Sequence, residues 1–254
     1  MRRELFKDCA RALFGTVQWL PALLDFDASY EGDAKHFRRA YPGCGLPDCA
    51  ELATVHSRSL TRLRVCMLGG PEEDNFLRLS GLPELRSLEL AGRPDWPLNI
   101  RIDAESFEDT LQLQNMCVRD DEALHLQECV LQKLTALTSL SLVGCGLQSV
   151  PVDAALLADT LVELDLSNNE PMELTDNGVV IIVHCSRLQV LSLHKPDKFV
   201  KWADKFGIKW PAVQGHMVGE GYRPLTWKHK SIEHLVQLPS LFRAKHGRDL
   251  DLRL

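Results

Sequence analysis

The sequence predicts an α/β repeat solenoid, with a curved parallel β-sheet on its concave side and helices and loops on its convex side. A leucine-rich unit occurs twice in full, as LxxLxLxxC over residues 137–145 and as LxxLxLxxN over residues 161–169. Its first half recurs over residues 188–193. The central Leu-x-Leu alternates apolar and polar residues, which is the period of a strand with one buried face. A single strand of this kind cannot bury its apolar side, so neighbouring copies are expected to stack around a shared leucine core.

The two complete units identify the expected core and its turns. The leucines of each strand should point inward, and the closing Cys or Asn should lie where the chain turns away from the strand. An Asn side chain at such a turn can bond backbone groups that the turn leaves unpaired. The core residues predicted in this way are Leu140, Leu142, Cys145, Leu164, Leu166, Asn169, Leu191 and Leu193.

These units resemble the leucine-rich repeat family, which implies a ribonuclease-inhibitor-like solenoid. Between the second and third copies, residues 174–179 read LTDNGV and residues 184–188 read HCSRL. This stretch is similar to the helix start and helix end of the cysteine-containing subclass. Thr175 or Asp176 can cap such a helix. Cys185 is then interpreted as a small buried apolar residue rather than a reactive or metal-binding thiol.

Three earlier strands continue the series towards the N-terminus. Residues 60–65 read LxxLxV and residues 85–90 read LxxLxL, while a degenerate copy is centred on Leu111-x-Leu113, with Glu108 in place of its first leucine. The anchor positions of the six strands are residues 63, 88, 111, 140, 164 and 191, with gaps of 23 to 29 residues. This spacing predicts about six or seven irregular repeats.

The ends of the array are expected to be covered by helical caps, because a terminal repeat has an unpaired strand edge and exposed leucines. Apolar residues at helical spacing predict a helix over 4–24, and the Gly- and Pro-rich residues 25–50 are expected to form a loop. Leucines near 235–241 predict a further helix or partial repeat, and 250–254 a last edge strand. The predicted organisation is an N-terminal helical and loop cap over 1–56, repeats over 57–195, and a basic, aromatic-rich insertion with a C-terminal cap or last partial repeat over 196–254.

Charge is distributed unevenly along the chain. The net charge of -6 is modest and argues against a general nucleic-acid binder. Residues 71–128 carry fourteen acidic and five basic side chains, a balance of -9, whereas residues 195–230 carry eight basic and three acidic ones, a balance of +5. The two ends of the array should therefore have opposite electrostatic potentials.

The eight cysteines are scattered, and two of them, Cys145 and Cys185, occupy repeat positions. This pattern favours reduced thiols and a cytoplasmic location over a disulfide framework. Cys44 and Cys49 have a metal-like spacing but lack a second pair, so no zinc site is expected. Residues 12–24 have the length of a signal-peptide core, yet Gln18 interrupts them and no cleavage site follows.

The non-leucine positions of the strands should point outward on the concave face and bind a protein partner by hydrogen bonds and charge matching. Basic residues lie towards the N-terminus of this face and acidic ones in the fifth copy. The predicted partner-binding residues are Arg62, Arg64, Arg86, Glu89, Gln112, Glu163, Asp165 and His194.

A second surface is predicted within the basic segment 195–230, where aromatic residues fall on one helical face flanked by lysines. One interpretation is a capping helix whose aromatic side chains cover the last repeat. The other is a docking helix for an acidic partner, formed by Lys198, Lys201, Trp202 and Lys205. Asp197 and Asp204 interrupt the basic charge, so a membrane is not the expected partner. Nucleic acid is not expected either, because aromatic side chains between lysines stack on bases only where they are exposed.

These features predict a non-catalytic protein-binding scaffold without a cofactor, a metal or a small-molecule substrate. The sequence lacks a phosphate-cradling glycine loop, a Gly-x-Ser-x-Gly elbow and a His-Glu-x-x-His helix. The resemblance to cysteine-containing repeats implies an alternative, the substrate receptor of a cullin-type ubiquitin ligase, and residues 19–24 (WLPALL) are similar to the opening of an F-box. Similarity to repeat proteins of dynein arms implies another, a structural component of an axoneme or the cytoskeleton. The sequence leaves these alternatives open.

Overall fold

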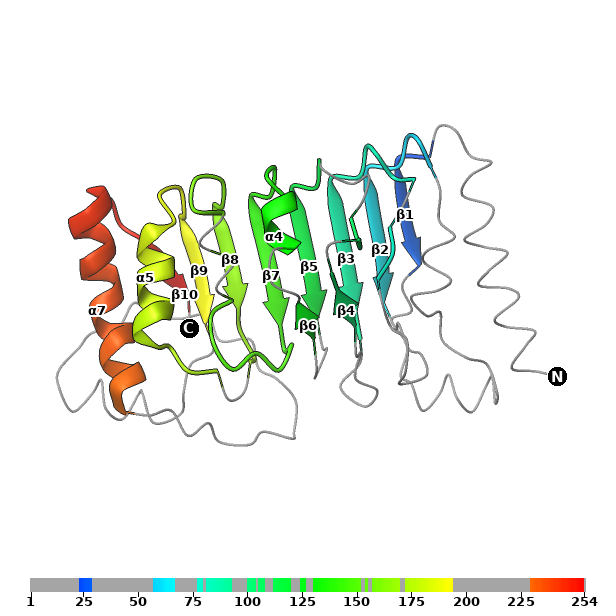
Figure 1. Cartoon of the computed structure of the whole chain (residues 1–254). Helices are drawn as coiled ribbons and strands as arrows, with labels where there is room; N and C mark the ends of the chain where they lie inside the picture. The colour runs from blue at the N-terminus through cyan, green and yellow to red at the C-terminus, as the bar shows by residue number, and fades with distance from the viewer. Residues whose placement is uncertain are drawn as a thin grey trace.

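The computed structural model describes residues 23–28, 57–66, 77–79, 81–92, 100–103, 105–107, 112–119, 124–126, 130–151, 154, 157–169, 172–193 and 229–253. Within them it contains an open sheet of eight parallel strands in the order β1-β2-β3-β5-β7-β8-β9-β10, and a two-stranded parallel sheet, β4-β6. The chain is therefore of the α/β class, and the strands of the large sheet follow one another side by side in chain order (Figure 1).

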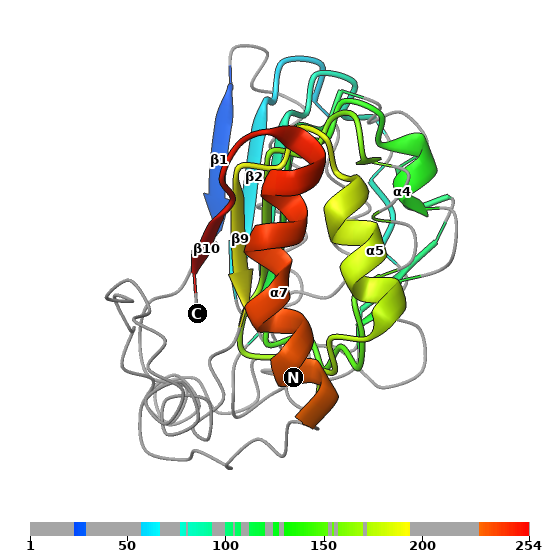
Figure 2. The same cartoon turned by 90° about the vertical axis from the view of Figure 1, so that its left-hand side faces the viewer.

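The large sheet is built from short strands joined by longer returns. Its strands are β1 (Asp25–Ala28), β2 (Arg62–Cys66), β3 (Ser87–Ala91), β5 (Asn115–Arg119), β7 (Ser139–Val143), β8 (Glu163–Leu166), β9 (Val190–Leu193) and β10 (Asp251–Arg253). The other elements are β4 (Arg101–Ile102), β6 (His125–Leu126), α4 (Val130–Lys133), α5 (Asp176–His184) and α7 (His229–His246). Figure 2 shows these helices on one side of the large sheet. The opposite side, which none of the described helices covers, is called the open face below.

The strands are aligned so that one apolar residue of each lies beside the next. This row runs Phe26, Leu63, Leu88, Met116, Leu140, Leu164, Leu191 and Leu252. Phe26 is partly buried and the other seven are buried. Burying a leucine side chain stabilises a fold by roughly 1.5–3 kcal/mol, so a continuous row of this kind is a large share of the folding free energy.

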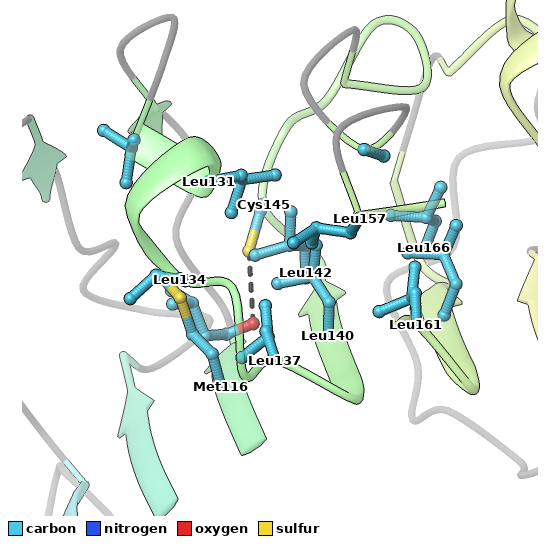
Figure 3. Close-up of a cluster of buried hydrophobic side chains, with 14 of the residues drawn as sticks. Met116, Leu131, Leu134, Leu137, Leu140, Leu142, Cys145, Leu157, Leu161 and Leu166 are labelled. Carbon is cyan, nitrogen blue, oxygen red and sulfur yellow. Dashed lines mark hydrogen bonds between the residues drawn. The ribbon is translucent and has the colours of Figure 1, made fainter. Parts of the chain in front are cut away.

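The core predicted from the two complete units is confirmed. All eight predicted core residues, including the polar Asn169, are at most 1% exposed. Figure 3 shows Cys145 in a cluster of buried side chains that includes Leu142 of its own unit and Leu157 from the following part of the chain. The alternation of Leu-x-Leu therefore assigned the buried side of these strands correctly.

The register of the third strand was predicted wrongly. The expected centre was Leu111-x-Leu113, but the strand is β5, in which Met116 and Val118 are the buried residues. Leu113 is instead the buried residue that precedes the strand. Methionine fills a leucine position readily because its side chain is unbranched and adaptable. A search for leucine alone therefore misplaced the unit.

The prediction of a loop over residues 25–50 was wrong at its start, where β1 pairs with β2. The sequence Asp25-Phe26-Asp27 alternates in the manner of a strand with one buried face. Aspartate is depleted in strands, but both aspartates face arginines of β2, as described below. The predicted N-terminal helix, apart from residues 23–24, lies outside the described residues.

The helix predicted after Thr175 is confirmed as α5. The Thr175 hydroxyl accepts a hydrogen bond from the Gly178 N–H at 3.1 Å and so caps the first turn. Cys185, at the end of the helix, is fully buried. Burial raises the pKa of its thiol to about 11, so the thiol is protonated near neutral pH and Cys185 is a packing residue, as predicted.

The predicted C-terminal helix and edge strand are confirmed as α7 and β10. Two histidines of α7 fix it against α5. His234 lies 3.0 Å from the Leu174 carbonyl through Nδ1 and 2.8 Å from the Asp176 carboxylate through Nε2. His246 Nε2 lies 2.7 Å from the Val183 carbonyl. No described helix is long and apolar enough to cross a membrane.

Candidate protein-binding face

The open face consists of the strand residues that alternate with the buried ones. Two rows cross it in register. The first is Asp25, Arg62, Ser87, Asn115, Ser139, Glu163, Val190 and Asp251, and the second is Asp27, Arg64, Glu89, Cys117, Ser141, Asp165, Ser192 and Arg253. All of these residues except Val190 and Cys117 are polar or charged, so the face suits contacts made by hydrogen bonds and charge.

The N-terminal part of the open face is a ladder of ion pairs. Arg62 lies 3.1 Å from Asp25, and Arg64 lies 3.3 Å from Asp27 on the same strand pair. Arg64 Nε also lies 3.2 Å from Glu89 Oε2.

The ladder continues to β5, where Arg119 pairs with the second oxygen of Glu89. Opposite charges on adjacent strands stabilise a sheet when the register places them side by side. Each charge from β1 to β5 in this ladder therefore has an opposite partner within the face.

The middle of the open face is neutral and made of small side chains. Cys117 on β5 and Ser139 and Ser141 on β7 are all partly buried between their neighbours. Because these side chains are short, they project only a little way from the backbone of the sheet. A partner could approach the strands closely here without displacing a long side chain.

Two acidic side chains on β8, Glu163 and Asp165, have no opposite charge beside them in the described part of the chain. The Glu163 carboxylate accepts a hydrogen bond from the Ser139 hydroxyl at 3.4 Å, and Asp165 accepts one from the Ser167 N–H at 3.0 Å. Among the described residues, no basic side chain forms an ion pair with either carboxylate. The other charged residues on the open-face strands all have such a partner. Those from β1 to β5 pair within the ladder, and Arg253 pairs with Asp251 at 2.9 Å on β10. The net negative charge of the face is therefore concentrated on β8.

Five of the eight predicted partner-binding residues lie on the open face: Arg62, Arg64, Glu89, Glu163 and Asp165. Arg86 lies immediately before β3, exposed and 3.9 Å from Glu84. Gln112 lies in the turn before β5 rather than on a strand, because the true strand starts three residues later. Its predicted place on the strand was therefore wrong.

Several other predicted site residues lie outside the described residues. They are His194 of the concave face and Lys198, Lys201, Trp202 and Lys205 of the docking helix. The sequence-based selection also missed charged open-face residues, among them Asp25 and Asp27 on β1 and Arg119 on β5. The signals that mark them are the Asp-Phe-Asp alternation and the Met-x-Val pattern of β5.

A further charged cluster lies away from the open face and has a structural role. The Arg78 guanidinium makes two hydrogen bonds to the Asp103 carboxylate, at 2.9 and 3.0 Å, and Asp103 also accepts the Glu105 N–H at 2.9 Å. Burial raises the pKa of Asp103, but the hydrogen bonds from Arg78 and Glu105 outweigh it, so the pKa lies below its usual value. The cluster ties two return segments together. In the described part of the chain, no group of three or more His, Cys, Asp or Glu side chains is arranged to hold a metal ion.

In comparisons with known proteins, no family model and no curated protein matches the chain. The binding properties of the open face are therefore inferred from its own side chains. These offer a broad polar surface, a neutral strip of short side chains formed by Cys117, Ser139 and Ser141, and two carboxylates on β8 that have no ion-pair partner among the described residues.

Proposed function

We propose that this protein is a ribonuclease-inhibitor-like leucine-rich repeat solenoid that binds a partner protein, without catalysis, on its open face. The in-register rows of buried leucines and the buried Asn169 at a turn support the repeat interpretation. The open face would then be the concave side of the array, and its in-register polar rows would form the binding surface. The reduced, buried cysteines at repeat positions are consistent with a cytoplasmic protein.

The observation that carries this proposal is that Glu163 and Asp165, beside the neutral strip of β7, have no ion-pair partner among the residues that the structure describes. Charges that already have partners within a surface add little to binding, whereas an unpaired charge can be matched by a partner. A partner with Lys or Arg side chains opposite β8 would form ion pairs with these two carboxylates. Its backbone or small side chains would pack on Ser139 and Ser141. The site has few aromatic residues, so a moderate affinity and a salt-dependent association rate are expected.

The test is affinity capture from native cell extract, with partners identified by mass spectrometry. The Glu163→Lys/Asp165→Lys variant should retain the fold and lose the partners that the wild-type chain captures. A matched control is Glu84→Lys/Asp159→Lys, which makes the same change in charge at two exposed residues outside the open-face strands. Loss of partners with the first variant alone supports the proposal. Equal capture by wild type and the open-face variant would place the binding site elsewhere.

The identity of the captured proteins would also separate the alternatives that the sequence leaves open. Cullin-ligase adaptors would support a role as a substrate receptor. Tubulin, dynein or other structural proteins would support a role in the cytoskeleton or an axoneme.

A further inference from the structure

Among the described residues, the outer edge of β10 has no strand to pair with. β10 is the last strand in the order of the large sheet, and its one neighbour among the described residues is β9. The Asp251 N–H donates to the Gln189 carbonyl at 2.8 Å, so the backbone groups of Asp251 point towards β9. Successive residues of a strand point their N–H and C=O groups to opposite sides. The N–H and C=O of Leu252 therefore point away from β9, at the end of the sheet that faces the viewer in Figure 2.

The charges on this edge are arranged symmetrically about Leu252. Leu252 packs on the core side, while Asp251 and Arg253 on either side of it face the open side. Their side chains are 56% and 62% exposed and form an ion pair with each other at 2.9 Å. Both charged groups are thus available at the edge of the sheet.

We propose that two copies of this chain associate edge to edge through β10, as an antiparallel pair related by a two-fold axis beside Leu252. Leu252 would exchange two backbone hydrogen bonds with Leu252 of the partner subunit. Asp251 would then lie opposite Arg253 of the partner subunit, and Arg253 opposite Asp251 of the partner subunit. These are the positions where antiparallel strands approach most closely, with Cα atoms about 4.5 Å apart, so both ion pairs can form across the interface.

A second copy fits this edge better than an unrelated strand because the order of its charges is self-complementary. The antiparallel arrangement places unlike charges opposite each other at both positions. A parallel arrangement in the same alignment would place Asp opposite Asp and Arg opposite Arg. The two large sheets would become one continuous sheet, with both open faces on the same side. A short, charged edge strand can also serve to prevent association, and the experiment below separates the two roles.

The test is analytical ultracentrifugation of the full chain over a wide range of concentrations. The wild-type chain should show a monomer–dimer equilibrium. Asp251→Arg and Arg253→Asp each place two like-charge pairs across the interface, so each should weaken dimerisation by about tenfold or more. The Asp251→Arg/Arg253→Asp double variant restores unlike charges at both positions and should dimerise like the wild type. Glu163→Lys, on the same face but two strands away, should leave the equilibrium unchanged.

Circular dichroism of each variant checks that the fold is retained, which is expected because both substituted side chains are exposed. A wild-type chain that stays monomeric at every concentration would overturn the proposal and leave the charges as a protection against association. Single variants that dimerise as well as the wild type, or a double variant that does not recover, would show that β10 is not the interface.

Discussion

The side chain of Asn169 bonds the backbone of Cys145, the residue at the same position of the preceding unit. Asn169 Oδ1 accepts the Cys145 N–H at 2.7 Å and the Leu147 N–H at 3.2 Å. Its Nδ2 donates to the carbonyls of Leu142, at 2.6 Å, and Leu166, at 2.9 Å. One buried amide therefore satisfies turn groups of two adjacent units and couples their stability.

Asn169→Ala should lower the stability of the protein markedly. It leaves buried N–H and C=O groups of two turns without partners, and each such group costs about 1–3 kcal/mol. Urea unfolding should show a clear fall in the midpoint. Asn115→Ala is the matched control, because Asn115 is exposed on the open face, and it should change stability by less than about 0.5 kcal/mol. Equal effects of the two substitutions would rule out the bridging role of Asn169.

Gly178 allows α5 to lie close to the return segment of the preceding unit. A Cβ atom at this position would lie 3.0 Å from Val150 Cγ2 and 3.4 Å from Leu174 Cδ1. Gly178→Val should therefore displace α5 and lower the free energy of unfolding by about 1–3 kcal/mol. Asn177→Ala, at an exposed position of the same helix, should be neutral or slightly stabilising. A Gly178→Val variant as stable as the wild type would contradict the close packing.

The Arg78–Asp103 cluster should contribute to the acid sensitivity of the fold. Because the pKa of Asp103 is lower in the folded chain than its usual value, the unfolded chain binds this proton first as the pH falls. The stabilisation is fully present above the usual aspartate pKa, and it is lost as the pH falls through the folded pKa.

Urea unfolding of the wild type and Asp103→Asn between pH 7 and pH 3 measures this contribution. The variant should be less stable at pH 7 and should lose less stability on acidification than the wild type. Parallel curves for the two proteins would show that Asp103 does not contribute to the pH dependence.

The sequence was most informative where leucine fills the repeat position. The units at β7, β8 and β9 were predicted with their buried residues, because Leu-x-Leu marks the inner face unambiguously. β5 was misplaced because Met116 and Val118 occupy the leucine positions. β1 was missed because its aspartates suit a strand only when Arg62 and Arg64 lie beside them, and this pairing depends on which strands become neighbours.

The candidate site was predictable in part for the same reason. Glu163 and Asp165 belong to a complete unit, so their place on the outer face followed from the alternation. The ion pairs of Glu89 with Arg64 and Arg119 could not be predicted, because they depend on the register of β5 relative to β3. Because Glu89 is paired in this way, the acidic side chains of the open face that have no ion-pair partner among the described residues are Glu163 and Asp165 on β8.

Leu140 and Ser141 are adjacent residues on opposite faces of β7, so a comparison of Leu140→Asp with Ser141→Asp is the decisive test of which face is buried. Leu140 is 1% exposed, and a buried unpaired carboxylate costs several kcal/mol, so Leu140→Asp should unfold the chain cooperatively. Ser141→Asp should keep native circular dichroism and lower stability by no more than about 1 kcal/mol. A native Leu140→Asp variant, or an unfolded Ser141→Asp variant, would show that the open face and its binding residues are wrongly assigned.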